Sequence, residues 1–218
     1  MKNNIKKLLA LEVEAIQNIP VNDSFESAVM LIKEHVHNLG GKVVVSGMGK
    51  AGQIGINIAQ TLCSTGTPAV FLHPSEAQHG DLGILCKNDI LILLSNSGKT
   101  REISELIMLS KRLHTDVKVI SITGKLDSPL AKESDVVLHT GNSSEICPLG
   151  LTPTISTTLM TVIGDMVVVE LMREIEFTKT EYSKRHHGGY LGVVSKSTEK
   201  APSSLLDELP PYDYQLDN

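Results

Sequence analysis

In the first 39 residues, apolar and polar positions alternate with the period of a helix. Residues 3–19 carry apolar side chains at near-helical spacing and Pro20 follows them, so we predict a helix that ends there. Short polar residues at 22–24 can cap a second helix, which we predict to run to about Leu39, where two glycines end it. The chain therefore begins with two helices.

From residue 42 the pattern changes to short, unbroken apolar runs, each followed by an amphipathic segment. A run that is apolar on both faces is typical of a strand in a parallel sheet with helices on both sides. The strands are predicted over residues 42–46, 69–72, 90–94, 117–122 and 136–139. The helices are predicted up to residue 64, over 100–113, from Ser128-Pro129 and over 153–174, with a polar loop at 73–83. We therefore predict an α/β fold, a doubly wound five-stranded parallel sheet with two N-terminal helices.

The length of 218 residues suits one substantial domain rather than two. We predict a single domain over residues 1–195. The segment 196–218 is rich in Ser, Lys and Pro, and we predict a C-terminal tail that is extended or partly ordered.

Composition narrows the possible partners. A formal net charge of −5 leaves no basic surplus to neutralise phosphates, which argues against nucleic acid. No apolar run approaches the roughly 20 residues of a membrane helix, so we expect no membrane partner. The three cysteines are odd in number and unpatterned, which favours a reduced, cytoplasmic protein.

The third predicted strand ends in a polar loop, Ser95-Asn96-Ser97-Gly98-Lys99-Thr100, and a helix follows. Short hydroxyl side chains, a glycine and the free amides of a helix N-terminus make a site for one phosphate or another small anion. A nucleoside triphosphate loop would need a glycine where Leu93 stands, so that interpretation fails. The remaining alternative is that the hydroxyls only cap the helix.

The first predicted strand ends in Gly47-Met48-Gly49-Lys50-Ala51-Gly52. This spacing fits a dinucleotide fingerprint, but no acidic residue ends the second strand to hold a ribose. Two other interpretations stay open. The glycines can simply let a helix pack on the strand, or Lys50 can face a small anionic ligand.

Other candidate residues lie in the loops that follow strands, where sites of such folds are found. His79 stands in a glycine-punctuated loop, and Glu145 follows the fifth strand, where a partly buried carboxylate could act as a general base with a pKa near neutrality. Cys147 is interpreted as a packing residue. His186 and His187 could join His79, Glu145 or Glu102 around a metal, but their spacing matches no closed ligand set, so we expect no metal.

Together these stretches resemble the sugar isomerase (SIS) domain family, and within it the arabinose-5-phosphate isomerases. The resemblance covers residues 5–195. It rests on the glycine turn at 47–52, residues 73–83, Ser95-Asn96-Ser97-Gly98 with Thr100 and Glu102, the stretch Cys147-Pro-Leu-Gly-Leu-Thr-Pro-Thr with Ser156 and Gly164-Asp165, and His186 with Gly188-Gly189. It implies a flavodoxin-like fold.

The resemblance also implies an aldose–ketose isomerase that interconverts D-arabinose 5-phosphate and D-ribulose 5-phosphate through an enediol, with no cofactor. The implied catalytic residues are Glu145, Lys50, His186, His79 and Glu102, and the implied phosphate and sugar ligands are Ser46, Gly47, Ser95, Asn96, Ser97 and Thr100. Of these, Glu145 is expected to be the base, Lys50 to stabilise the enediolate, and Glu102 to orient Lys50 or a histidine. The implied pathway is Kdo synthesis for lipopolysaccharide or capsule. A homotetramer with active sites shared between subunits, and feedback by a sugar nucleotide, are further expectations.

Two substitutions depart from the family pattern. Lys99 stands where an acidic residue is common, and His187 replaces a proline next to His186. The paired CBS domains of longer members do not follow, so we expect no control through such modules. The alternatives are a non-catalytic domain that binds a sugar phosphate or sugar nucleotide, and an isomerase of another phosphosugar.

Overall fold

The computed structural model describes residues 1–188 and residue 195. Gly189 and the predicted tail at 196–218 lie outside the described residues. The chain divides into two units, Met1–Phe177 and a second unit that begins at Thr178.

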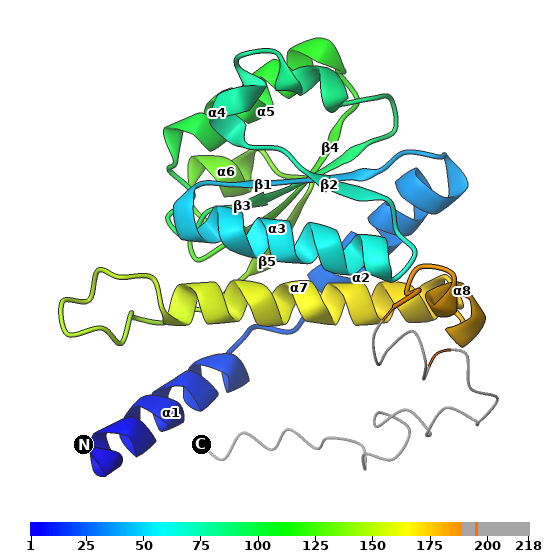
Figure 1. The fold of residues 1–218 in the computed structure, drawn as a ribbon. Helices are drawn as coiled ribbons and strands as arrows, with labels where there is room; N and C mark the ends of the chain where they lie inside the picture. Colours follow the sequence, from blue (N-terminus) through cyan, green and yellow to red (C-terminus); the bar gives the residue numbers. More distant parts are fainter. Residues whose placement is uncertain (189–194, 196–218) are drawn as a thin grey trace. The chain divides into compact units, whose positions relative to one another are not determined.

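The first unit is built on the predicted five-stranded parallel sheet (Figure 1). Its strands are β1 (Val43–Gly47), β2 (Ala69–Phe71), β3 (Ile90–Leu94), β4 (Lys118–Thr123) and β5 (Val136–His139). They lie in the order β2-β1-β3-β4-β5, with Val45 beside Ile92 and Ile92 beside Ile120. The chain thus starts near the middle of the sheet and winds outwards in both directions, which confirms the predicted doubly wound α/β fold.

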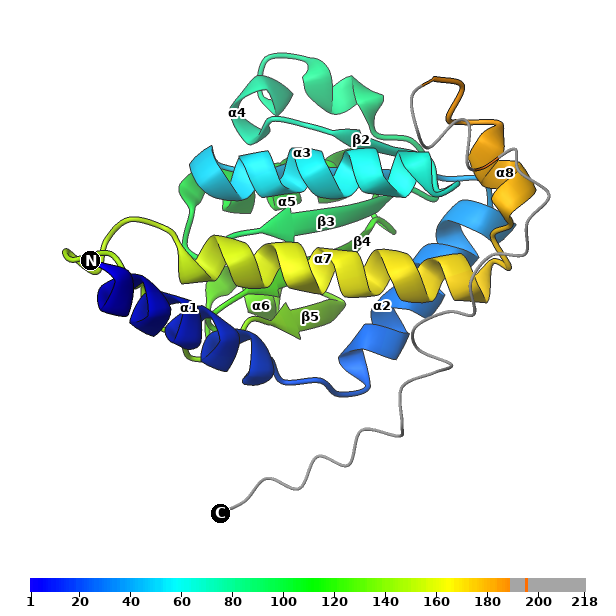
Figure 2. The same ribbon diagram turned by 60° about the horizontal axis from the view of Figure 1, so that its bottom comes forward.

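Alternate residues of each strand face opposite sides of the sheet, as the period of a strand requires. On one side Val43, Val45 and Ile92 share a core with α3 (Gly49–Ser64), α2 (Ser24–Ile32), α7 (Ile155–Glu174) and the end of α1 (Lys2–Gln17). On the other side Val44 and Leu91 pack with α5 (Arg101–Leu113), α4 (Pro74–Ala77) and α6 (Pro129–Lys132). Figures 1 and 2 show these two helical layers.

Helix α7 corrects one expectation from the sequence. By length and composition alone this helix could cross a membrane, although we expected no run to be long enough. Half of its most apolar window is buried inside the fold. Its side chains Leu159, Ile163 and Val167 are almost fully buried in the core beside the sheet. The helix is apolar because it lies between the sheet and other helices.

Helices α3 and α7 pack against each other at Gly164. A β-carbon at this position would lie 2.6 Å from Cγ1 of Ile58, closer than such atoms can come. Glycine therefore leaves room between the two helices for the branched side chain of Ile58, which fills that space.

Some local elements differ from the prediction. The helix predicted up to Leu39 becomes a π-helix over Lys33–Asn38 (η1) after α2. The segment predicted as a loop at 73–83 contains α4, which starts at Pro74, and a 3₁₀ turn over Asp81–Ile84 (η2). A short helix, α8 (Lys179–Ser183), was not predicted at all.

Two aspartates form similar hydrogen bonds to the neighbouring strand at the amino edge of the sheet. Asp89, just before β3, accepts hydrogen bonds from the Lys42 amide at 2.8 Å and from Lys42 Nζ at 2.6 Å. Asp135, just before β5, accepts from the Val119 amide at 2.8 Å and from Lys118 Nζ at 2.9 Å. The carboxylates differ in burial, because the side chain of Asp89 is 1% exposed and that of Asp135 is 34% exposed.

This matched pair yields a prediction about stability. Replacing Asp89 by Ala leaves a half-buried ammonium and buried amides without partners, so the free energy of unfolding should fall by about 3 kcal/mol. Asp135→Ala should cost about 1 kcal/mol, because water can replace the lost bonds. Urea denaturation of both variants measures the difference, and equal losses would show that burial does not set the strength of these pairs.

Candidate active site

A cavity of about 390 Å³ lies at the carboxyl edge of the sheet, within the size range of small-molecule sites, about 300–1,000 Å³. Its walls come from the segments after β1 and β3 and from the first turn of α7 with the loop before it. Six of the predicted site residues line it together: Lys50, Ser95, Asn96, Ser97, Thr100 and Glu145. The other lining residues are Met48, Ala51, Leu94, Gly150, Leu151, Pro153, Ser156, Thr157 and Met160.

Three helices start at this cavity. Lys50 and Ala51 belong to the first turn of α3, Thr100 is the N-cap of α5, and Ser156 lies in the first turn of α7. Each helix N-terminus carries roughly half a positive charge on its free amides. Together with the Lys50 ammonium they give the cavity a positive field, which suits a phosphate.

The loop 95–100 is held in shape by its own hydroxyl groups. The hydroxyls of Ser95 and Thr100 are hydrogen-bonded to each other at 2.8 Å, and Ser95 Oγ also accepts from the Gly98 amide at 3.1 Å. Ser97 Oγ accepts from the Lys99 amide at 3.2 Å. Since two hydroxyls share one hydrogen between them, the Ser95–Thr100 pair keeps one hydrogen to donate to a ligand.

Gly98 allows this loop to fold tightly against its neighbour. Its φ is +61°, and a β-carbon there would lie 2.1 Å from Ser128 Oγ. Its carbonyl accepts from the Leu130 amide at 3.1 Å in the first turn of α6. The loop 95–100 is thus held on one side by the start of α6.

The glycine turn at 47–52 has mainly a packing role. A β-carbon on Gly52 would lie 2.6 Å from the Gly47 carbonyl oxygen, so these two glycines let α3 sit directly on β1. Ser46 is fully buried, and its hydroxyl donates to the Leu72 carbonyl at 2.6 Å. Ser46 and Gly47, both predicted to bind substrate, do not line the cavity, whereas Lys50 does.

Glu145 is held at the start of α7. Its Oε2 accepts hydrogen bonds from the Thr154 amide at 2.7 Å, the Thr154 hydroxyl at 2.9 Å and the Ser156 amide at 3.4 Å. Burial by itself raises the pKa of Glu145, but the hydrogen bonds from Ser156 and Thr154 outweigh it and hold the pKa below its ordinary value. The expectation of a pKa near neutrality is therefore wrong. The carboxylate is ionised at neutral pH.

His79 and Glu102 lie outside the cavity wall. His79 is exposed just after α4, and its amide donates to the Glu76 carbonyl at 2.8 Å. Glu102 is half-buried in the first turn of α5. Among residues 1–188, no hydrogen bond or ion pair joins Glu102 to Lys50, although we expected this carboxylate to orient the lysine or a histidine.

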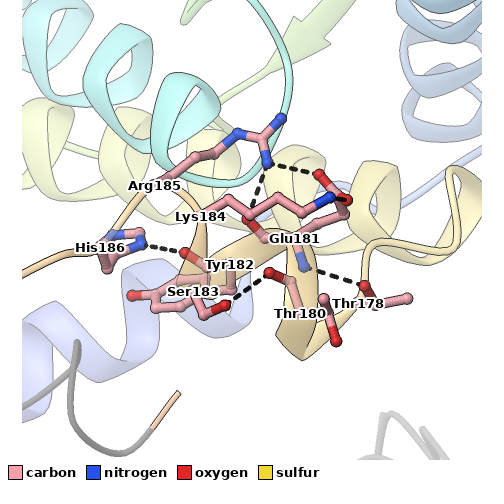
Figure 3. Close-up of polar contacts among 8 residues, drawn as sticks. All are labelled: Thr178, Thr180, Glu181, Tyr182, Ser183, Lys184, Arg185 and His186. Atoms are coloured by element: carbon pink, nitrogen blue, oxygen red, sulfur yellow. Dashed lines mark hydrogen bonds and ion pairs between the residues drawn. The ribbon is translucent and has the colours of Figure 1, made fainter. Parts of the chain in front are cut away.

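His186 belongs to the second unit, where it follows α8 (Figure 3). Its ring stacks on that of Tyr182 with centroids 3.7 Å apart, and its Nδ1 lies 3.0 Å from the Tyr182 carbonyl oxygen. A carbonyl can only accept, so Nδ1 carries the hydrogen, and Nε2 has no hydrogen-bond partner among the described residues. Beside it, Glu181 pairs with Lys184 and Arg185.

Two functional features were not predicted from the sequence. Ser156 and Thr157 line the cavity, and Thr154 holds Glu145. The available signal was their place at the start of a long apolar helix, where free amides and hydroxyls collect. Within the described part of the chain, no three His, Cys, Asp or Glu side chains lie close enough to bind a metal ion.

Cys147 begins the loop that joins Glu145 to Thr154. Its sulfur accepts hydrogen bonds from the Thr152 amide at 3.1 Å and the Leu151 amide at 3.2 Å. The Thr152 amide, with the other amides of this loop, lowers the pKa of the Cys147 thiol to about 7. The thiol therefore organises a loop that forms one wall of the cavity.

Comparison with known proteins agrees with this geometry. The SIS domain model matches residues 40–170. A candidate phosphosugar isomerase involved in capsule formation, from Bacteroides fragilis, is 64% identical with a TM-score of 0.86, over 87% of this chain and 99% of that one. Escherichia coli CFT073 c3406, solved in complex with arabinose 5-phosphate, is 35% identical with a TM-score of 0.78, over 84% of this chain and 96% of that one.

A curated relative extends the comparison. The arabinose 5-phosphate isomerase KdsD of Shigella flexneri is 46% identical over 189 residues, which make up 86% of this chain and 56% of the relative. This chain thus spans little more than half the length of the curated relatives that it matches.

The loop chemistry predicts which cysteine reacts first. Cys147 should be alkylated by iodoacetamide faster than Cys63 and Cys86, with a rate that reaches half its maximum near pH 7. The other two thiols are more exposed, but they donate hydrogen bonds to carbonyls instead of accepting them from amides. Peptide mass spectrometry at several pH values measures all three rates, with Cys147→Ser to assign the signal. Equal rates at pH 7 would contradict the loop geometry.

Proposed function

The chain belongs to the SIS domain family, and from that starting point we propose that it is an aldose–ketose isomerase that interconverts D-arabinose 5-phosphate and D-ribulose 5-phosphate. The observation that carries the proposal is the meeting of one ionised carboxylate, one lysine and a hydroxyl-rich anion loop in a single cavity. The isomerase name of the KdsD relative and the sugar-phosphate complex of c3406 support the choice of substrate.

The reaction moves one proton between C1 and C2 of the sugar and another between O1 and O2. Glu145 is the base for the carbon-bound proton, since it is ionised and lines the cavity. Lys50 stabilises the negative charge that develops on oxygen in the enediolate. His186 or His79 moves the oxygen-bound proton, and the free Nε2 of His186 suits that role.

The phosphate group serves as the handle of the substrate. Ser95, Ser97 and Thr100 hold it with the N-terminal amides of α5, while Asn96 contacts the sugar. Binding energy from this remote group is then available to position C1 and C2 against Glu145. Ser46 and Gly47 do not line the cavity, but they lie beside Leu93 and Leu94, at the end of the strand that leads into this loop.

Beyond the reaction, we propose a cytoplasmic enzyme that supplies Kdo synthesis for lipopolysaccharide or capsule, with feedback from a downstream sugar nucleotide. The role in capsule formation given for the Bacteroides fragilis relative supports the pathway. We also propose a single isomerase domain over residues 1–195.

We further propose a homotetramer with active sites shared between subunits. Helix α1 supports this, because a stripe of its apolar side chains is exposed along its first three turns. The stripe consists of Ile5, Leu8, Leu9 and Val13, which are between 37% and 63% exposed. A second copy of the chain can bury this stripe.

The base assignment predicts the effect of Glu145→Gln. In deuterated water the wild-type protein should exchange hydrogen at C2 of arabinose 5-phosphate and form ribulose 5-phosphate, as followed by NMR. Glu145→Gln should slow both by about a thousandfold, because the amide cannot accept the proton. Calorimetry should show retained binding, and Glu133→Gln, an exposed control, should keep full activity. Near-full turnover in Glu145→Gln would refute the base, and wild-type binding without exchange would indicate a sensor domain.

The exposed stripe predicts the effect of a charge on α1. Leu9→Lys should reduce the assembly from a tetramer to smaller species, because burying an ammonium in an apolar interface is costly. Light scattering during size-exclusion chromatography measures the mass. Asn3→Lys adds the same charge away from the stripe and should leave the mass unchanged. An unchanged mass in Leu9→Lys would place the interface elsewhere.

A further inference from the structure

The two oxygens of the Glu145 carboxylate have different surroundings. The hydrogen bonds from the Thr154 amide, the Thr154 hydroxyl and the Ser156 amide all reach Oε2, and the Ser156 side chain also helps to lower the pKa of this carboxyl. We propose that Thr154 is a positioning residue, which holds Oε2 so that Oε1 faces the substrate and carries the proton between C1 and C2. This inference rests on the isomerase function proposed above.

The hydrogen of the Thr154 hydroxyl can point in only one direction. Thr154 Oγ1 accepts a hydrogen bond from the Ile146 amide at 3.2 Å and lies 2.9 Å from Glu145 Oε2. The carboxylate cannot donate, so the hydroxyl hydrogen goes to Oε2. Since Ile146 directly follows Glu145, the Thr154 hydroxyl hydrogen-bonds both to the backbone next to the base and to its side chain.

The support behind Thr154 is rigid. Thr154 is the N-cap of α7, and its own side chain does not cap that helix. The Glu145 carboxylate takes this place, because it accepts from the Thr154 and Ser156 amides at the helix start. The next residue, Ile155, is 2% exposed in the core. Glu145 lies in a loop, but these hydrogen bonds hold its carboxylate at the start of α7, the long helix of the core.

Hydrogen bonds to Oε2 alone have two effects on Glu145: they keep the carboxylate charged and they fix its orientation. The three donors keep the negative charge on the carboxylate before the reaction, as a base requires. They also prevent rotation that would exchange the two oxygens, so one lone pair is presented to the substrate in a constant direction. When Oε1 takes the proton from carbon, the hydrogen bonds on Oε2 stay in place until the proton is returned.

The test compares Thr154→Val, Thr154→Ser and Thr161→Val. Val removes the hydroxyl but keeps the shape and the amide, so kcat should fall about ten- to a hundredfold while KM changes less than about threefold. The acid limb of the kcat/KM profile should move to higher pH, because Glu145 loses a donor that favours its charged form. Thr154→Ser should restore kcat and the position of the acid limb. Thr161→Val makes the same change two turns along α7, where the hydroxyl donates to the Thr157 carbonyl, and should behave like wild type.

A second measurement does not depend on activity. Carbon-13 NMR of labelled glutamate, with the Glu145 signal assigned by its loss in Glu145→Gln, follows the ionisation of this carboxyl. In the wild-type protein it should titrate below the ordinary range of glutamate, and in Thr154→Val at higher pH. An ordinary value in the wild type, or a fall in kcat without a change of pH profile or titration, would overturn the positioning role. If the wild type has no isomerase activity, the proposed function fails, and the titration still shows whether Thr154 holds Glu145.

Discussion

The site depends on an electrostatic constraint: the N-termini of α3 and α5 and one lysine meet at the carboxyl edge of the sheet, beside a third N-terminus, that of α7, which the Glu145 carboxylate caps. A parallel sheet creates this arrangement, since its helices start where its strands end. Such a field holds a phosphate dianion and also stabilises negative charge on a sugar oxygen. The carboxylate must then stay charged and correctly aimed within the same field.

Glu145 meets that requirement by hydrogen bonding rather than by burial. A buried, poorly solvated carboxylate would be a stronger base, but part of it would be protonated at neutral pH. The hydrogen bonds to Oε2 give the opposite balance, a weaker base that is always ionised and always oriented. In the proposed reaction, the energy for removing the proton from carbon would then come largely from stabilisation of the enediolate by Lys50.

The sheet could be predicted from the sequence because its strands are unbroken apolar runs. The strands at 90–94 and 136–139 match the prediction, and the others differ by one or two residues. The four-residue helix α4 was missed because it is too short to show a period and depends on the packing of Ala77 and Leu72. Six of the residues that line the cavity could be predicted from the sequence, because they lie in the loops that follow strands. The bond between Thr154 and Glu145 could not be predicted, since it depends on the path of the loop between them.

The close approach of α3 and α7 has an evolutionary consequence. Gly164 and Ile58 fill one space between them, so neither side chain can change size alone without opening a hole or pushing the helices apart. A larger residue at 164 requires a smaller one at 58. Because the same two helices carry Lys50 and the support of Glu145, a shift at this contact would change the distance between the proposed base and the lysine proposed to stabilise the enediolate. The pair is therefore expected to covary among relatives that keep the same chemistry.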